Sequence, residues 1–385
     1  MFYEKQPLNQ QNEYKSMLSL IGSLSNLFAD SETPMLYYRA HENVFCKYFE
    51  AENLSREDCS ADASKGTIGI GLKTWVGRND QKVAEFGKLR PTYEKLAGND
   101  LINKIAEYRN ERIRVTKNIH GLDQMIYHIV KRIPHGMQIY EATFDCIDIK
   151  NIKLDKSRGN ENNTYFSDGK HTYHFSMSKN TLFMLFDDME LLDSFDVEIL
   201  KDPYEALKNL LTNKNENLYP IINQNYVNTM SNKDNKLCLR LYSIKKGKKV
   251  VFSKSGLNQW NANGRKRNVN ELYIRYPVED RKRKIFFTPT NKSFNLFLPD
   301  GSKMSAKVCQ ASGKAIMSNP NSALGKWLLR DVFELEEGKI VTYDMLKIFG
   351  IDSVMFTKID NDNYRIDFCP LGTYEAFYDL EDIDD

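Results

Sequence analysis

The chain has 385 residues, 41% of them hydrophobic and 28% charged, which is typical of a globular protein. At roughly 100–200 residues per domain this length favours two domains, and no apolar run approaches the roughly 18 residues that a membrane span needs. The net charge is only +2, the N-terminal residues 1–11 lack the apolar core of a signal peptide, and the six cysteines form no C-x-x-C pair. We therefore expect a cytoplasmic protein without a disulfide framework or zinc knuckle.

The N-terminal half mixes helical and extended patterns. Apolar residues recur at helical spacing over residues 17–28, and further helices are expected at 36–49, 80–86 and 101–116. Short strands are expected at 60–63, 67–75, 137–150 and 172–177.

Residues 212–236 are polar and rich in Asn and Lys, which predicts a linker. Extended patterns separated by turn residues dominate after it. Strands are expected at 237–244, 250–253, 271–276, 284–288, 293–298, 302–310 and 364–368, and a helix at 322–330. Many short strands at regular spacing favour a small barrel.

Charge is distributed unevenly along the chain. Residues 231–330 hold 22 Lys and Arg against 5 Asp and Glu, whereas residues 331–385 hold 4 against 15. A polyanion would be attracted to the basic block through its field and through released counterions. The alternative is a solvated lysine-rich surface, but here the basic residues are interleaved with turn residues and aromatics.

A group of residues in the N-terminal half has the chemistry of metal-assisted phosphodiester hydrolysis, which needs carboxylates for a divalent cation and a cation to orient water. Asp62 ends the first expected strand, and Lys73 lies on the second after Gly71-Leu72. This resembles the PD-(D/E)XK nuclease core, in which an Asp is followed by an acidic-x-Lys tripeptide. Here Gly71 takes the acidic position.

Some restriction endonucleases of that superfamily carry the second acid on a following helix, and Glu85 has the matching spacing from Lys73. The resemblance implies that Asp62 and Glu85 bind Mg²⁺, that Lys73 orients the water, and that Glu42 on the preceding helix supports the site. The alternative is a surface Asp, a surface Lys and a helix-face Glu. A lysine in an otherwise apolar strand favours the functional interpretation, because it is costly without a partner.

Other chemistries fit less well. None of the six histidines begins a His-x-Lys motif, and the sequence has no P-loop. His171 and His174 have a spacing that hints at metal, but no Cys or third His follows, so a structural or phosphate-facing role is favoured. Arg109 and Arg112 share a helix face and are either phosphate contacts or solvated charges.

Two segments of the basic block combine turn residues with groups that hydrogen-bond to bases and phosphates. They are residues 255–267 and residues 310–321. Arg matches guanine edges, Asn and Gln match adenine, and all of them bind phosphate.

Residues 237–369 resemble the B3-like DNA-recognition domain of type II restriction endonucleases. The resemblance rests on Ser255–Asn261 with Gly264-Arg265, and on residues 271–274, 287–289, 294–301, 313–331, 343–346 and 350–354. It implies an open barrel with two DNA-binding arms, here called the N-arm (255–267) and the C-arm (310–321). The implied DNA contacts are Trp260, Asn261, Arg265 and Arg267 in the N-arm and Gln310, Lys314, Ser318 and Asn319 in the C-arm.

Together these patterns predict an α+β protein: a PD-(D/E)XK-like catalytic domain at 1–215, a linker at 216–235, and a B3-like open barrel with an acidic tail at 236–385. The predicted function is that of a Mg²⁺-dependent type II restriction endonuclease. It would act on double-stranded DNA, as a homodimer or by sequential nicking, and would be paired with a DNA methyltransferase. The alternatives are a non-catalytic sequence-specific DNA-binding regulator, which Gly71 in the acidic position favours, and a nuclease acting on RNA or single strands.

Overall fold

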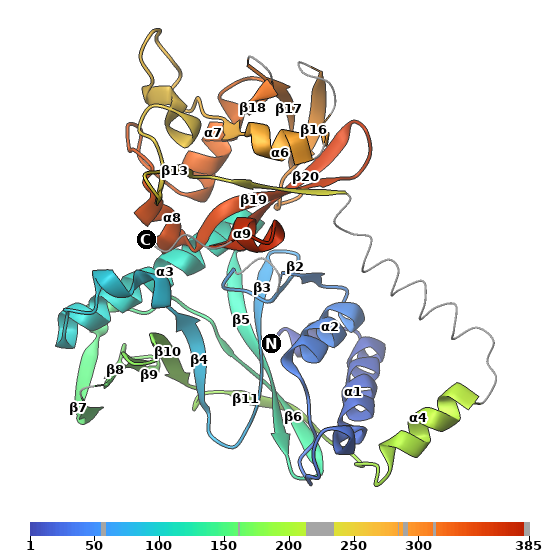
Figure 1. Cartoon of the computed structure of the whole chain (residues 1–385). Helices are drawn as coiled ribbons and strands as arrows, with labels where there is room; N and C mark the ends of the chain where they lie inside the picture. Colours follow the sequence, from blue (N-terminus) through green and yellow to red (C-terminus); the bar gives the residue numbers. More distant parts are fainter. Residues whose placement is uncertain are drawn as a thin grey trace. The chain divides into compact units, whose positions relative to one another are not determined.

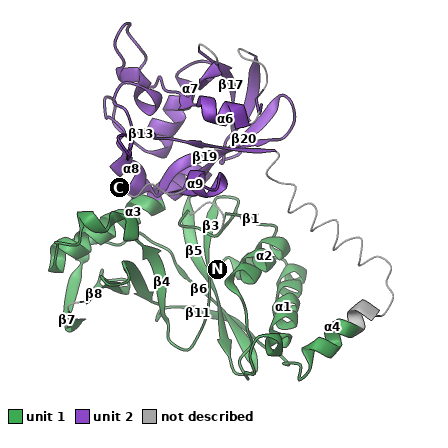
Figure 2. Ribbon diagram, in the orientation of Figure 1, with its two compact units in different colours: residues 1–113, 122–217 green, residues 114–121, 218–385 purple. Residues whose placement is uncertain are grey.

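The computed structural model describes residues 1–54, 59–160, 162–212, 235–283, 285–287, 292–310 and 313–380 (Figure 1). They form two compact units, residues 1–113 with 122–217 and residues 114–121 with 218–385 (Figure 2). Apart from Asn235, the predicted linker at 216–235 lies outside the described residues, as does the end of the acidic tail. In the described part of the chain, no helix combines the length and apolar character that a bilayer crossing needs.

The described residues of the first unit form two sheets and several helices. The helices are α1 (Leu8–Ser23), α2 (Tyr38–Tyr48), α4 (Pro203–Thr212) and most of α3 (Gly98–His120), whose residues from 114 onward belong to the second unit. The first sheet has the order β1 (Glu52–Asn53), β2 (Ala63–Lys65), β3 (Ile68–Val76), β5 (Gln124–Ile133), β6 (Gly136–Thr143) and β11 (Glu190–Asp196). The second has the order β4 (Asp80–Glu85), β10 (Thr181–Leu185), β9 (Thr172–Ser176), β8 (Asn163–Ser167) and β7 (Lys153–Asn160).

Strand β3 is the centre of the first sheet. It pairs antiparallel with β2 and parallel with β5, and α3 lies in the long connection that parallel pairing requires. One face of β3 carries Ile70 and Leu72, which are buried in a core with residues of α1 and α2. Since successive side chains point to opposite faces, Gly71 and Lys73 belong to the other face.

The predicted helix at 80–86 is wrong, because these residues form strand β4 and pair with β10. Partners from a distant part of the sequence decide the conformation here, since the segment itself has no strong apolar row. The helices predicted at 36–49 and 101–116 are confirmed as α2 and α3.

The second unit is built on a seven-stranded sheet. Its order is β12 (Lys236–Arg240), β19 (Ile351–Lys358), β20 (Asn363–Pro370), β16 (Ser293–Phe297), β17 (Lys303–Cys309), β18 (Ala315–Ser318) and β15 (Ile274–Arg275). The end strands β12 and β15 contact each other, so the sheet nearly closes into a barrel around a large apolar core. The predicted barrel is therefore confirmed in outline, although the expected strand at 271–276 shrinks to two residues and β18 and β19 were not predicted.

The remaining elements of the second unit surround this sheet. They are the hairpin β13 (Ser243–Lys245) and β14 (Lys248–Val250), the turn η6 (Gly256–Asn261), the helices α6 (Val278–Arg283), α7 (Ala323–Gly325), α8 (Tyr343–Phe349) and α9 (Thr373–Phe377), and the π-helical turn η8 (Lys326–Val332). Helix α7 with η8 confirms the helix predicted at 322–330.

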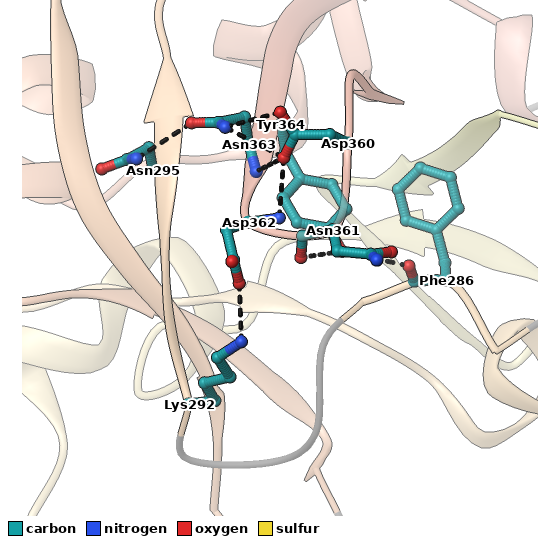
Figure 3. A network of polar contacts seen from close by, with 8 residues as sticks. All are labelled: Phe286, Lys292, Asn295, Asp360, Asn361, Asp362, Asn363 and Tyr364. Carbon is teal, nitrogen blue, oxygen red and sulfur yellow. Dashed lines mark hydrogen bonds and ion pairs between the residues drawn. The ribbon is translucent and has the colours of Figure 1, made fainter.

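The turn between β19 and β20 holds the parallel strand pair of the barrel together (Figure 3). The Asp360 carboxylate accepts hydrogen bonds from the backbone N–H groups of Asp362 and Asn363, at 2.8 and 2.9 Å. Asp362 in turn pairs with Lys292 at 2.7 Å, and Asn363 accepts from Asn295 of β16 at 2.9 Å. These contacts fasten β16 beside β20, the one parallel neighbour in the sheet within the described strands.

Candidate nucleic-acid interface and catalytic cluster

Asp62 and Lys73 are held close together by the β2–β3 hairpin. The backbone N–H of Asp62 donates to Ile70 O at 2.9 Å, and the N–H of Leu72 donates to Oδ2 of Asp62 at 2.7 Å. Both side chains are intermediate in exposure. The carboxylate is thus fixed by the strand that carries Lys73 and is still accessible from solvent.

The pKa values of these two groups move toward each other. Burial raises the pKa of Asp62, and the nearby Lys73 charge and the Leu72 N–H oppose that rise. Burial also lowers the pKa of Lys73; the Asp62 charge opposes this, while Arg109 and Lys82 lower it further. A lysine whose pKa is lowered by burial and by like charges gives up its proton more readily than a solvated one.

Glu42 on α2 belongs to the same electrostatic neighbourhood. It is only 5% exposed, and its Oε2 lies 2.9 Å from Nη1 of Arg39. Its charge acts on Lys73, and together with Asp62 it raises the pKa of Cys46, an effect dominated by burial. The structure therefore brings Glu42, Asp62 and Lys73 together.

Glu85 occupies a different environment from the one predicted for it. It ends strand β4 of the second sheet rather than lying on a helix, and its side chain is 54% exposed. Its carboxylate pairs with Lys82, and its backbone carbonyl accepts from Arg112 at 2.8 Å. The helix that was expected to return this carboxylate to Asp62 does not exist, because the segment is extended.

The glycine in the acidic position is explained by an aromatic stack. Gly71 lies opposite Tyr127 of β5, and a Cβ added to Gly71 would be 2.8 Å from the Tyr127 ring and 2.9 Å from the Phe144 ring. Tyr127 and Phe144 stack with their ring centroids 4.1 Å apart, and buried Arg109 donates to the Tyr127 hydroxyl at 2.8 Å. The rings of Tyr127 and Phe144 therefore occupy the space that a carboxylate side chain at position 71 would need.

The donor set near Lys73 can be compared with what Mg²⁺ requires. In the described part of the chain, no three His, Cys, Asp or Glu side chains form a metal-binding group. Mg²⁺ is usually bound through one or two carboxylates, with water and phosphate oxygens completing its shell. Asp62 and Glu42 are two carboxylates in the electrostatic neighbourhood of Lys73, whereas Glu85 ends a strand of the second sheet.

The predicted N-arm residues divide into exposed and structural ones. Arg265 is 56% exposed and donates to the buried Glu271 at 2.6 Å, whereas Arg267 is 12% exposed and its guanidinium donates to the backbone carbonyls of Ala262 and Asn263. Trp260 packs against the barrel core. The amide of Asn261 donates to Ser253 O at 2.8 Å. Arg265 is thus presented to solvent, while Arg267 and Trp260 shape the arm.

The predicted C-arm residues also divide into exposed residues and structural ones. Gln310, Lys314 and Asn319 are exposed. Ser318 is fully buried; its Oγ donates to Pro320 O and accepts from the Leu324 N–H, both at 2.8 Å. The structure therefore corrects the assignment of Ser318 as a DNA contact, because its hydroxyl closes the turn that leads into α7.

Several residues that hold the arms were not predicted from the sequence. The Asn258 side chain is fully buried; its amide donates to Phe252 O and Val341 O, and its Oδ1 accepts from the Val341 N–H. Gly325 allows α7 to approach the Asn270 backbone so closely that an added Cβ would lie 1.8 Å from Asn270 O. The only sequence signal for these roles is the presence of Asn and Gly among turn residues.

The two neighbouring histidines do not converge on one point. Nε2 of His171 lies 2.9 Å from Oγ1 of Thr143, whereas Nδ1 of His174 lies 3.3 Å from Oδ1 of Asp80. The arrangement agrees with structural or phosphate-facing roles, the interpretation favoured by the sequence.

Comparison with known proteins supports the second unit alone. Residues 231–360 match the model of the family described as the NgoFVII C-terminal B3-like DNA-binding domain. No curated protein gives a significant match to the chain. The nearly closed barrel and this match agree that the second unit is similar to the B3-like DNA-binding domain of a restriction enzyme.

Proposed function

We propose that the chain is a type II restriction endonuclease that hydrolyses phosphodiester bonds in double-stranded DNA with Mg²⁺ as cofactor. The match of residues 231–360 to a restriction-enzyme DNA-binding domain carries the proposal. The first unit supports it with the Asp62 carboxylate and Lys73 held together by the β2–β3 hairpin, beside a second acid, Glu42, from the preceding helix.

Each residue of the cluster has a role in this proposal. Asp62, with Glu42 as the second carboxylate, would hold Mg²⁺, which neutralises charge on the scissile phosphate and acidifies bound water. Lys73 orients the attacking water and accepts its proton, a role suited to an amine whose pKa is lowered by burial. Glu85 is not assigned a role in this proposal, because it lies on strand β4 and not on the helix expected to carry the second acid.

The second unit provides sequence recognition in this proposal. Arg265, Gln310, Lys314 and Asn319 present side chains at the surface of the two arms, where they can contact base edges and phosphates. Cutting both strands requires a homodimer or two sequential nicks, and a companion DNA methyltransferase would protect the host's own sites.

Digestion of unmethylated DNA of known sequence tests the proposal. The intact protein with Mg²⁺ should give discrete fragments whose mapped ends share one short sequence. Asp62→Asn should slow cleavage at least about a hundredfold, because the change removes the principal carboxylate. A folded protein that binds the DNA but leaves it intact with Mg²⁺ would overturn the catalytic half.

A second candidate function is a DNA-binding regulator without catalysis. The filled acidic position at Gly71 and the placement of Glu85 on another sheet favour it, because both depart from the nuclease pattern. Specific DNA binding without any metal-dependent loss of intact plasmid would select this function.

A further inference from the structure

The second sheet of the first unit carries a row of aromatic rings that the proposed catalytic cluster does not use. Tyr165, His174 and Phe183 lie opposite one another on β8, β9 and β10. The Tyr165 and His174 rings stack at 4.8 Å between centroids, and the His174 and Phe183 rings at 4.6 Å with only 2° between their planes. We call this row the ring ladder.

The ring ladder lies on the less buried face of its sheet. The alternating residues Phe166, Phe175 and Leu182 are at most 1% exposed and form the buried face, whereas Tyr165 and Phe183 are intermediate in exposure. Cations lie at both ends: the Arg158 guanidinium is 5.5 Å from the Tyr165 centroid, and the Lys179 ammonium is 5.8 Å from that of Phe183.

A cavity of about 470 Å³ opens beside the Tyr165 end of the ladder. Its lining includes the aromatic groups Tyr165 and His174 and the cations Arg78, Lys131 and Arg158. This volume falls within the usual range for small-ligand sites, about 300–1,000 Å³.

The hydrogen-bonding groups of the cavity suit the edge of a base. Asn79, Asp80 and Asp187 also line it. Asp80 is engaged with His174 at 3.3 Å, and the Asn79 Oδ1 accepts from Lys131 at 3.0 Å, so the polar groups are held in place before a ligand arrives. Three cations against two carboxylates leave the lining net positive while His174 is neutral, and burial favours that neutral form by lowering its pKa.

We propose that this cavity binds one unstacked nucleotide, with its base against the Tyr165–His174 wall and its phosphate facing Arg78, Lys131 and Arg158. The ring faces of the ladder cover one another, so the base would meet the edges of Tyr165 and His174 that line the cavity, and the flanking cations would bind the phosphate. The shared chemistry is a base joined to a phosphate, and the source is either a nucleotide turned out of DNA or a free nucleotide. The inference rests on the proposed function only in naming DNA as one source.

Calorimetric titration of the full chain with each of the four deoxynucleoside 5′-monophosphates, and separately with inorganic phosphate, tests the site. The nucleotides should bind at least about tenfold more tightly than phosphate, and Tyr165→Ala should remove that advantage. Tyr165→Phe, which keeps the ring, should bind like the original chain. Tyr204→Ala, which removes a 63% exposed tyrosine on α4, is the matched control.

A duplex containing 2-aminopurine separates the two sources. The titrations omit Mg²⁺ and are repeated with Lys73→Ala, so they do not depend on cleavage. A rise in 2-aminopurine fluorescence that Tyr165→Ala abolishes assigns the site to DNA, and binding of free nucleotides without such a rise assigns it to a free nucleotide. Equal affinity for phosphate and nucleotides, or no binding and no rise in fluorescence, overturns the proposal.

Discussion

Each unit of the molecule contains a carboxylate beside a lysine, and the two pairs differ in their access to solvent. Asp62 and Lys73 in the first unit are both intermediate in exposure. In the second unit, Asp352 is fully buried and the side chain of Lys249 is 4% exposed; the lysine lies 4.0 Å from Asp352 and 3.3 Å from Glu375. Tyr242 and Tyr343 close that second cluster by donating to Glu375 and Asp352.

The comparison indicates which feature distinguishes a reactive cluster from a structural one. Both pairs have opposite charges, and burial raises the pKa of the carboxylate in each pair, so neither property separates them. The two pairs differ instead in exposed surface, because Asp62 and Lys73 each keep part of their surface exposed, whereas Asp352 and Lys249 are buried. We therefore expect the first pair to matter for chemistry and the second for folding.

Removal of the two lysines should have unequal effects on stability. Lys249→Met leaves the Asp352 and Glu375 carboxylates buried without their cation, which should lower the free energy of unfolding by about 3–5 kcal/mol. Lys73→Met should change the free energy of unfolding by less than about 1 kcal/mol, because the Asp62–Lys73 pair remains partly solvated. Denaturant unfolding of both proteins measures the difference, and equal losses would remove the proposed distinction.

The buried pair should also make stability depend on pH. Burial raises the pKa of Asp352 from 3.8 to about 6, against the opposing charge of Lys249. The folded state therefore holds this proton more tightly than the unfolded state, and the resulting stabilisation is complete below pH 3.8 and is lost as pH rises through about 6.

The asparagine side chain of the Asp352→Asn variant cannot ionise, so the stability of this variant should lack the pH-dependent contribution of Asp352. Between about pH 4 and pH 7, the free energy of unfolding of the original chain should fall by up to about 3 kcal/mol relative to that of Asp352→Asn. Unfolding curves at several pH values measure this, and parallel pH profiles for the two proteins would contradict the assignment.

The contrast between buried and exposed polar groups extends to the N-arm. Asn258→Ala leaves the buried N–H and carbonyl of Val341, and the carbonyl of Phe252, without their partner, which should cost about 2–3 kcal/mol of unfolding free energy. Asn263→Ala, at an exposed position of the same arm, should cost less than about 0.5 kcal/mol. Thermal melts of the two variants check this, and a similar small shift for both would show that Asn258 does not hold the arm.

A smaller effect is expected from the exposed arm residues. Lys314→Ala should weaken DNA binding by about five- to tenfold and reduce the steepness of its salt dependence by about one released ion, if the lysine contacts phosphate. Ser318→Ala should instead act through stability, because its hydroxyl is buried. Binding isotherms at several salt concentrations test both, and an unchanged salt slope for Lys314→Ala would exclude the phosphate contact.

The sequence predicted the second unit better than the first for a physical reason. The basic residues and the arm residues of the second unit lie in continuous segments, so a local pattern reveals them. In the first unit the same is true of the apolar patterns that predicted α2 and α3. The conformation of residues 80–85 depends on pairing with β10, and the significance of Gly71 depends on Tyr127 and Phe144. These partners are distant in sequence, so no local pattern reveals them.

The predicted arm contacts show the same limit at the level of single side chains. Serine and arginine are chemically suited to DNA in both arms, but Ser318 and Arg267 use their polar groups within the protein. Composition identifies the kind of surface, whereas the division into exposed and structural residues follows from the folded turns.

The most direct test of the central claim compares Lys73→Met with Lys88→Met, which changes an exposed lysine outside the cluster. Each protein is assayed for Mg²⁺-dependent cleavage of unmethylated plasmid and for binding of the same DNA without metal. We predict that Lys73→Met loses at least about a hundredfold in cleavage rate while binding DNA normally, and that Lys88→Met retains both properties. Cleavage by Lys73→Met at the original rate would contradict the account.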